Sequence, residues 1–309
     1  METPSLFPVI AFGAFGLMVG SFLNVAIHRL PLEGESVSHP RRSRCPGCRA
    51  ELTWYDNIPV VSWLALLGRC RQCGWRIPVR YPLVELLTAG LWAFAAWNAG
   101  GAVDLALAQV LVLSGLVVAT FVDFDYFEIP DEVSIGGMVV APIASLLVPA
   151  LHRDTRVALA FSEAGAAGEV DRLGALVGSG AGILVGGGVL WGIGWLGSRL
   201  FARDAMGFGD VKLLAAAGGF VGPGGALAAL LIGALVASVV GVLNMLRFFA
   251  LTRARARKRG ARQSMGKAVR VARIAGRYLP FGPYLGIGIG IVLLDWNHVI
   301  ELWRAFVTP

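Results

Sequence analysis

Long uncharged apolar segments constrain this chain more than any other feature of its sequence. The first runs from residue 6 to residue 27 without a charged side chain, and about 20 such residues suffice to cross the roughly 30 Å hydrocarbon core of a bilayer. It follows Glu2 rather than a basic leader, and it is too long for the apolar part of a signal peptide. The sequence therefore predicts an all-α polytopic membrane protein, because helices satisfy their own backbone hydrogen bonds in lipid.

Composition supports this fold class and excludes others. Hydrophobic residues make up 56% of the 309 residues and charged residues only 15%, which is too apolar for a soluble enzyme or a disordered chain. The chain has 41 glycines, and small residues are frequent where membrane helices approach closely. In one apolar segment, glycines recur every four residues from Gly174 to Gly186, which predicts a close contact between this helix and another.

We expect about eight transmembrane helices. They are predicted at residues 6–27, 83–97, 105–122, 133–152, 173–198, 213–222, 226–246 and 281–303. The segment 213–222 is short for a span and ends at the turn Pro223-Gly224-Gly225. Either it crosses the membrane, extended at its ends or in a locally thin bilayer, or it forms a re-entrant hairpin.

The distribution of basic residues predicts the orientation in the membrane. Nine arginines lie between residues 29 and 80, and ten basic residues without any acid lie between 253 and 277. Cytoplasmic loops are enriched in Lys and Arg, so both segments are expected inside and the N-terminus and the loop 153–172 outside. Both basic segments fall on the same side only if the segment 213–222 crosses, which favours a crossing over a re-entrant hairpin.

The same basic patches would suggest nucleic-acid binding in a soluble protein. In a chain this apolar, they are better explained as cytoplasmic loops beside the lipid bilayer. We therefore predict the bilayer as a partner and no nucleic acid; the sequence does not indicate an oligomeric state.

Four cysteines in the polar segment between the first two spans predict a metal site. They form two C-x2-C pairs separated by 21 residues, namely Cys45, Cys48, Cys70 and Cys73. This spacing is typical of a four-thiolate zinc site, which has no open position and is usually structural. A redox dithiol or disulfides are the alternatives, and the reducing cytoplasm disfavours disulfides. We expect a small zinc-ribbon-like domain, since the segment has little apolar mass and a metal would stabilise it.

Two groups of acids are predicted at the inner membrane edge. Asp123 and Asp125 come at the end of the third span, and Asp210 lies in Gly207-Phe208-Gly209-Asp210 at the start of the short one. Two carboxyl groups that share a site and a proton can act as general base and general acid. The alternatives are a solvated loop for the first group and a helix first-turn acid for Asp210. Glu85, near the start of the second span, can pair with Arg80.

Several of these segments, in this order, closely resemble those of the bacterial prepilin peptidases, the bifunctional type IV prepilin leader peptidases and N-methyltransferases. The resemblance covers most of the chain. The matching motifs are Gly20-Ser21-Phe22-Leu23-Asn24-Val25, Cys45-Pro-Gly-Cys48, Asp56-Asn57-Ile58-Pro59, Gly68-Arg69-Cys70, Arg80-Tyr81-Pro82-Leu83-Val84-Glu85, Ile129-Pro130-Asp131, Gly207-Phe208-Gly209-Asp210-Val211-Lys212 and Pro280-Phe281-Gly282-Pro283-Tyr284.

The resemblance implies a GxGD-type aspartic protease with a catalytic pair at Asp123 and Asp210, Asp125 being the close competitor of Asp123. It implies that the enzyme cleaves the basic leader of prepilins or type II secretion pseudopilins at the cytoplasmic edge of the bacterial inner membrane. It also implies methylation of the new N-terminal residue with S-adenosylmethionine. The four cysteines match the zinc site of the bifunctional members. No G-x-G-x-x-G loop follows a strand here, so the cofactor site is not indicated by the sequence.

These features divide the chain into three parts. Residues 1–28 form the first helix, residues 29–82 the four-cysteine domain associated with methyl transfer, and residues 83–309 the transmembrane peptidase domain. The run 252–278 is longer and more basic than is usual at this place in the family, which suggests a topological anchor or a contact with anionic lipid.

Two functions of other classes remain open at this point. A transporter could use intramembrane acids as a proton relay, but such acids would lie near the middle of the bilayer rather than at one edge. A membrane-anchored zinc-ribbon adaptor would need neither aspartate, so its activity would survive their loss.

Overall fold

The computed structural model describes residues 6–32, 34, 36–38, 42–163, 165–202, 206–258, 280–296 and 298–301. Within these residues the fold is helical, and isolated bridges join Arg44 to Glu51 and Arg69 to Arg76. The longer helices are α1 (Leu6–Arg29), α3 (Arg80–Asn98), α4 (Val103–Tyr126), α5 (Asp131–Leu147), α7 (Arg172–Phe201), α8 (Phe208–Lys258) and α10 (Gly282–Leu294). The short ones are η1 (Trp54–Asn57), α2 (Val61–Ala65), η2 (Pro149–His152), α6 (Arg156–Ala160) and η3 (Gly165–Ala167).

The all-helical membrane class is confirmed. In the described part of the chain, four helices are long and apolar enough to cross a bilayer: α1, α4, α7 and the part of α8 up to Ala254. Helix α10 is apolar but shorter, and the predicted span 133–152 is divided into α5 and η2. The count of eight transmembrane helices therefore stays a prediction. Most of the basic run 252–278 lies outside the described residues.

Helix α8 consists of two helices between which the chain reverses direction at Gly222. Its first half is residues 208–222, and its second, longer half is residues 223–258. This glycine has φ +73°, in the left-handed region that residues with a Cβ rarely adopt. A Cβ placed at Gly218 would lie 3.4 Å from the Cβ of Ala226, although eight residues of continuous helix would separate them by about 12 Å. The first half of α8 meets Ile129 at Gly209 and Thr155 at Gly222. It therefore extends along the whole length of α5.

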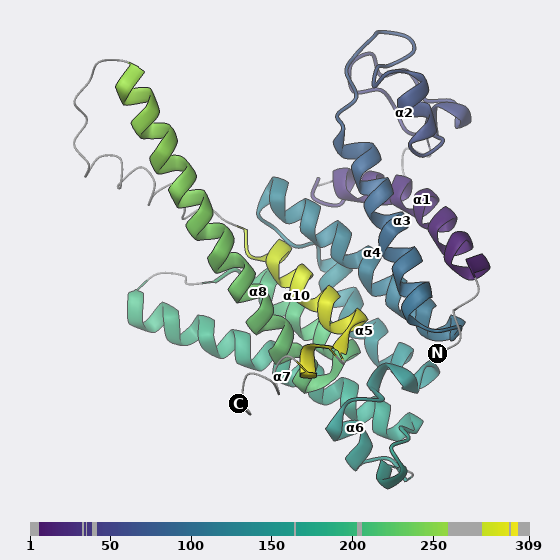
Figure 1. The fold of residues 1–309 in the computed structure, drawn as a ribbon, viewed down its shortest axis with the longest axis vertical. Coiled ribbons are helices and arrows are strands. Elements are labelled where there is room, and N and C mark those ends of the chain that lie inside the picture. The colour runs from purple at the N-terminus through teal and green to yellow at the C-terminus, as the bar shows by residue number, and fades with distance from the viewer. Residues whose placement is uncertain are drawn as a thin grey trace.

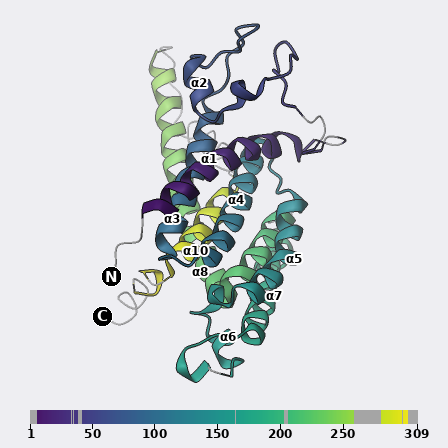
Figure 2. The same cartoon turned by 90° about the vertical axis from the view of Figure 1, so that its right-hand side faces the viewer.

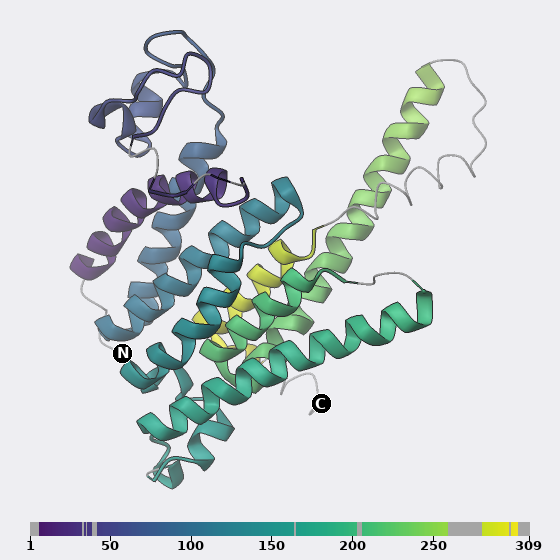
Figure 3. The same ribbon diagram turned by 180° about the vertical axis from the view of Figure 1, so that it is seen from behind.

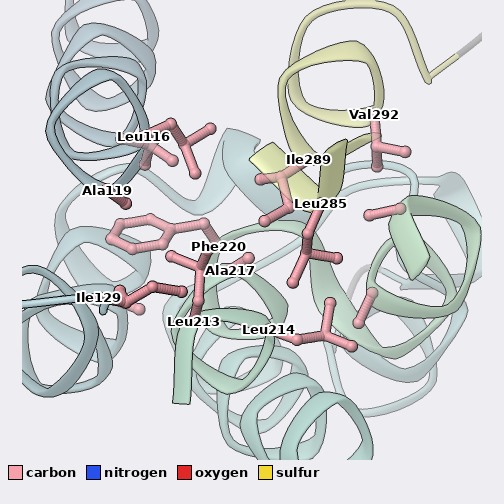
Figure 4. Packing of buried hydrophobic residues seen from close by; sticks show 14 of the residues in the cluster. Leu116, Ala119, Ile129, Leu213, Leu214, Ala217, Phe220, Leu285, Ile289 and Val292 are labelled. Carbon is pink, nitrogen blue, oxygen red and sulfur yellow. The ribbon is translucent and has the colours of Figure 1, made fainter. Parts of the chain in front are cut away.

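The helices form one bundle with a pair attached to it (Figures 1 and 3). Helices α4, α5, α7, α8 and α10 pack around a common core, and α1 and α3 pack against each other and against α4. The core is apolar and joins α4, α5, α7, both halves of α8 and α10; Figure 4 labels ten of its residues, among them Leu116, Phe220 and Leu285. The second half of α8 extends beyond the other helices (Figure 3).

Large apolar side chains cover the outside of this bundle. On α1, Phe7, Ile10 and Phe15 are exposed, whereas the buried face includes Gly16 and Gly20. This arrangement is the reverse of a soluble protein and suits a surface in contact with lipid. The two glycines allow α1 to cross α3 closely, since a Cβ at Gly20 would lie 2.7 Å from the Cα of Glu85.

The glycine repeat predicted to form a helix contact lies between α7 and the first half of α8. A Cβ at Gly182 would lie 1.9 Å from the carbonyl oxygen of Gly218, and one at Gly186 2.5 Å from that of Leu214. Backbone atoms cannot move away from such a clash as a side chain can. These two glycines therefore set the distance between α7 and the helix that carries Asp210.

We expect the substitution Gly182→Ala to destabilise the protein by about 1–3 kcal/mol, as overpacking of a helix contact does. Gly188→Ala on the same helix is the matched control, because a Cβ there meets nothing within 4 Å. Thermal unfolding in detergent should show a lower melting temperature for Gly182→Ala and no loss for Gly188→Ala. Equal melting temperatures for both variants would mean that this contact is looser than described.

Candidate active site

The four cysteines come together in a small domain at one end of the molecule, beyond the end of α1 (Figure 2). Their Sγ atoms all lie within 4.8 Å of one another, and those of Cys45 and Cys73 are 3.8 Å apart. Sulfur atoms around a tetrahedral zinc ion at about 2.3 Å are separated by roughly 3.8 Å. The donor set therefore fits one zinc ion, and none of the four cysteines forms a disulfide.

The two cysteine pairs lie in equivalent turns, which explains why they meet. The N–H of Cys45 donates to Ala50 O at 2.9 Å, and that of Cys70 donates to Trp75 O at 2.8 Å. The fifth residue of each turn is left-handed, with φ +59° at Arg49 and +70° at Gly74.

Asp123 and Asp210 line one cleft, of about 470 Å³. Asp123 lies in the last turn of α4 and is 6% exposed, and Asp210 lies in the first turn of α8. The structure thus brings together, from the ends of two helices, the two acids that the sequence singled out.

A third helix end orients Asp123. The backbone N–H of Gly282, the first residue of α10, donates to Asp123 Oδ2 at 2.9 Å in a buried hydrogen bond. The first N–H groups of a helix have no partner within the helix and are directed at an acceptor before it. The absence of a side chain at Gly282 is required here, because a Cβ would lie 2.6 Å from Oδ2.

The neighbouring acids have different surroundings. Asp125 forms an ion pair with Arg80 and does not line the cleft. Asp131 lines the cleft and forms an ion pair with Lys212. The structure therefore distinguishes Asp123 from Asp125, which the sequence left as competitors.

One sequence expectation about the acids is wrong, and one contact was missed. Glu85 does not pair with Arg80, because Arg80 reaches Asp125 and Phe121 O, while Glu85 Oε2 accepts from the N–H of Val60 at 2.7 Å. The contact of Gly282 with Asp123 was also missed. The motif around Gly282 was visible in the sequence, but nothing indicated which helix it would contact.

This arrangement suits proton transfer to and from a peptide bond. A water molecule between two carboxyl groups can lose a proton to one, while the other donates a proton to a carbonyl oxygen. Gly207 and Gly209 line the same cleft, and residues without side chains let an extended peptide approach closely.

Comparison with known families agrees with this geometry. Residues 14–99 match the family model described as the bacterial peptidase A24 N-terminal domain, and residues 110–242 match that of the type IV leader peptidase family. The first match includes the four cysteines, and the second includes Asp123 and Asp210.

Curated relatives are similar over most of the chain. A protein of Aeromonas hydrophila is 35% identical over 94% of this chain and 91% of its own length, and one of Pseudomonas aeruginosa is 33% identical over the same shares. A third, of Myxococcus xanthus, is 40% identical over 78% of this chain but only 64% of its own length. Each is named prepilin leader peptidase/N-methyltransferase. No solved structure matches this chain.

Proposed function

The chain belongs to the type IV leader peptidase family, and we propose that it cleaves prepilin leaders with an Asp123–Asp210 dyad and then methylates the new N-terminus with S-adenosylmethionine. Type II secretion pseudopilins are substrates of the same chemical kind. The observation that carries the peptidase assignment is the cleft shared by Asp123 and Asp210. A transporter or a zinc-ribbon adaptor is not favoured, because neither needs these two acids together in one cleft.

The cleft also suits the substrate. Three further acids line it, Glu128, Asp131 and Glu132, against one base, Lys212. Such a surface attracts a basic leader, while the apolar segment that follows the leader would remain in the bilayer. The cleavage site would then lie at the membrane edge, beside the dyad.

The proposal is tested by incubating the purified protein in detergent with a prepilin that carries its basic leader. We expect the substrate to be shortened by the leader. A matched prepilin in which the leader's basic residues are replaced by Gln should be cut more slowly, because the acids of the cleft no longer attract it. Failure to cut the unmodified prepilin would contradict the peptidase assignment.

We also propose that Cys45, Cys48, Cys70 and Cys73 hold one structural zinc ion. The support is the mutual distance of the sulfur atoms and the pair of equivalent turns. A tetrahedral site filled by four thiolates leaves no position for substrate, so the ion would stabilise the domain rather than react. The domain has few buried apolar side chains of its own.

We expect the purified protein to contain about one zinc ion per chain and Cys45→Ser to lose it, because three thiolates bind zinc less tightly than four. Ser62→Ala is the matched control in the same domain, since its hydroxyl donates to the carbonyl of Ile58, just before α2, at 2.7 Å and not to a cysteine. Elemental analysis of protein prepared without chelator measures the content. Zinc-free wild-type protein would contradict the assignment.

For the orientation, we propose that the N-terminus and the loop 153–172 face the outside of the bacterial inner membrane and that the four-cysteine domain and the dyad face the cytoplasm. The first half of α8 supports a crossing there, because it reaches from Ile129, before α5, to Thr155, beyond the end of α5. Single cysteines introduced into the loop 153–172 should react with an impermeant reagent in intact cells, and those in the run 253–277 should not. Labelling of both loops from outside would exclude the crossing.

A further inference from the structure

A second cavity, of about 190 Å³, lies between the four-cysteine domain and the helices α1 and α3. Trp63 and Trp75 from the domain and Tyr81 from α3 contribute aromatic side chains to it. Glu85 contributes a carboxyl group. Neither aspartate of the dyad lines this cavity, so the peptidase chemistry does not account for it.

Glu85 is the unusual member of this lining. It is only 7% exposed, and none of the ion pairs found among the described residues involves it. Two other acids of the cavity differ, because Glu51 pairs with Arg44 and Asp56 pairs with Arg71. A buried carboxylate ordinarily has a cationic partner. Three arginines also line the cavity, but Arg44 and Arg71 pair with the other two acids and Arg29 donates to backbone carbonyl groups. Glu85 is therefore the lining acid that suits a positively charged group of a ligand.

The backbone that contacts Glu85 is held in a strained conformation. Val60 donates its N–H to Glu85 Oε2 at 2.7 Å and has φ +61°. A β-branched residue rarely adopts positive φ, and such strain concentrates at ligand sites, where the surroundings fix it. On the other side, Gly20 brings α1 against the backbone of Glu85. The carboxyl group of Glu85 is thus held by the N–H of Val60 and by the side chain of Ser21 on α1.

The cavity adjoins the cleft of the dyad. Arg29, the last residue of α1, lines the cavity, whereas the next two residues, Leu30 and Pro31, line the cleft. Arg80, which begins α3, pairs with Asp125 two residues from Asp123. A peptide end released at the dyad therefore has a short path to this cavity.

We infer that this cavity binds S-adenosylmethionine, with the sulfonium of the ligand facing Glu85 and its adenine against the aromatic side chains. The inference deepens the proposed function and rests on its methyl-transfer half. S-adenosylmethionine carries a sulfonium, an ammonium and a carboxylate, so its net charge is positive, and both an acid and aromatic faces attract such a cation. After transfer the sulfur is a neutral thioether, so the product binds Glu85 less strongly.

The transfer itself balances without a further reactant. The neutral N-terminal amine of the processed substrate attacks the methyl carbon and forms the N–C bond. The S–C bond breaks, and its electron pair stays on sulfur. The amine nitrogen then releases one proton to water.

Calorimetric titration of the purified full chain with S-adenosylmethionine and with S-adenosylhomocysteine tests this assignment. We expect Glu85→Gln to lower the affinity for S-adenosylmethionine about tenfold, the size of one lost charge-assisted contact. The affinity for S-adenosylhomocysteine, which has no sulfonium, should fall less than about twofold. Glu163→Gln, an exposed acid outside the cavity, is the matched control. Zinc content and melting temperature report whether each variant is folded.

A second pair of variants keeps the test independent of Glu85. Trp75→Leu should lower the affinity for both ligands, because both have an adenine that can stack on the indole ring. Trp54→Leu removes an aromatic side chain of the same domain that is 81% exposed and does not line the cavity, so both ligands should bind as to the wild type. Unchanged affinities in Glu85→Gln and Trp75→Leu, with a wild type that binds, would overturn the location alone. A wild type that cuts prepilin but binds neither ligand would overturn this inference together with the methyl-transfer half.

Discussion

Asp123→Asn and Asp210→Asn should each reduce leader cleavage by at least about a thousandfold, within the range that general acid–base groups supply. The reason is that the pair works as a unit: one carboxyl group takes a proton from water as the other gives one to the scissile carbonyl. An amide has nearly the same shape and cannot do either. Single-turnover cleavage of a prepilin by purified variants measures the effect, with zinc content and melting temperature as checks of folding.

Asp125→Asn is the matched control, because it makes the same change two residues away on the same helix. Its carboxyl group pairs with Arg80 outside the cleft, so we expect a mild effect. If instead Asp125→Asn were inactive and Asp123→Asn normal, the residue assignment would be wrong although an aspartic mechanism would stand. Cleavage at the wild-type rate by both Asp123→Asn and Asp210→Asn would exclude the aspartic peptidase.

Gly282→Ala should reduce cleavage about a hundredfold, the cost of moving a catalytic group by about 1 Å. The new Cβ would lie 2.6 Å from Asp123 Oδ2. Since that atom is the end of a side chain, the carboxyl group rather than the backbone would move, and the protein should still fold. The rate constant of the cleavage step, measured at saturating prepilin, reports this displacement.

Gly290→Ala on the same helix is the control, because a Cβ there meets only Leu113 Cδ2, at 3.9 Å, an ordinary contact. We expect normal cleavage from this variant. Equal rates for the two variants would show that the hydrogen bond of Gly282 does not position Asp123 for the reaction.

The choice between Asp123 and Asp125 depended on where one helix ends. The sequence predicted a span that stops at residue 122, so both acids fell just beyond its end and nothing indicated that they face different ways. Helix α4 continues to Tyr126 and ends where the N–H of Phe127, at φ +58°, bonds the carbonyl of Asp123. Residues two apart on a helix point about 200° apart, so only one of the two acids can face the cleft. An accurate helix end would have shown that the two acids point apart, but not which of them lines the cleft.

Other features could be predicted because they depend on spacing within the chain. The two C-x2-C pairs each form a turn of their own, so their equivalence is visible in the sequence. The glycine repeat from Gly174 to Gly186 indicated a close helix contact, although not that its partner is the first half of α8. Periodicity specifies a helix face and does not identify what packs against it.

Contacts between distant segments could not be predicted from one sequence. Gly282 and Asp123 are 159 residues apart and meet only because α10 packs between α4 and α8. Glu85 receives its hydrogen bond from Val60, whose positive φ no propensity would suggest for a valine. Both contacts follow from tertiary packing that overrides the local preferences of the residues.

We propose that one protein both cleaves a prepilin at an aspartate dyad and methylates the product. It is tested most directly by the intact mass of a prepilin incubated with the purified protein, with and without S-adenosylmethionine. We predict loss of the leader in both reactions and the addition of one methyl group, at the new N-terminus, only when the methyl donor is present. A prepilin of unchanged mass in both reactions, with protein that is folded and contains zinc, would contradict the account.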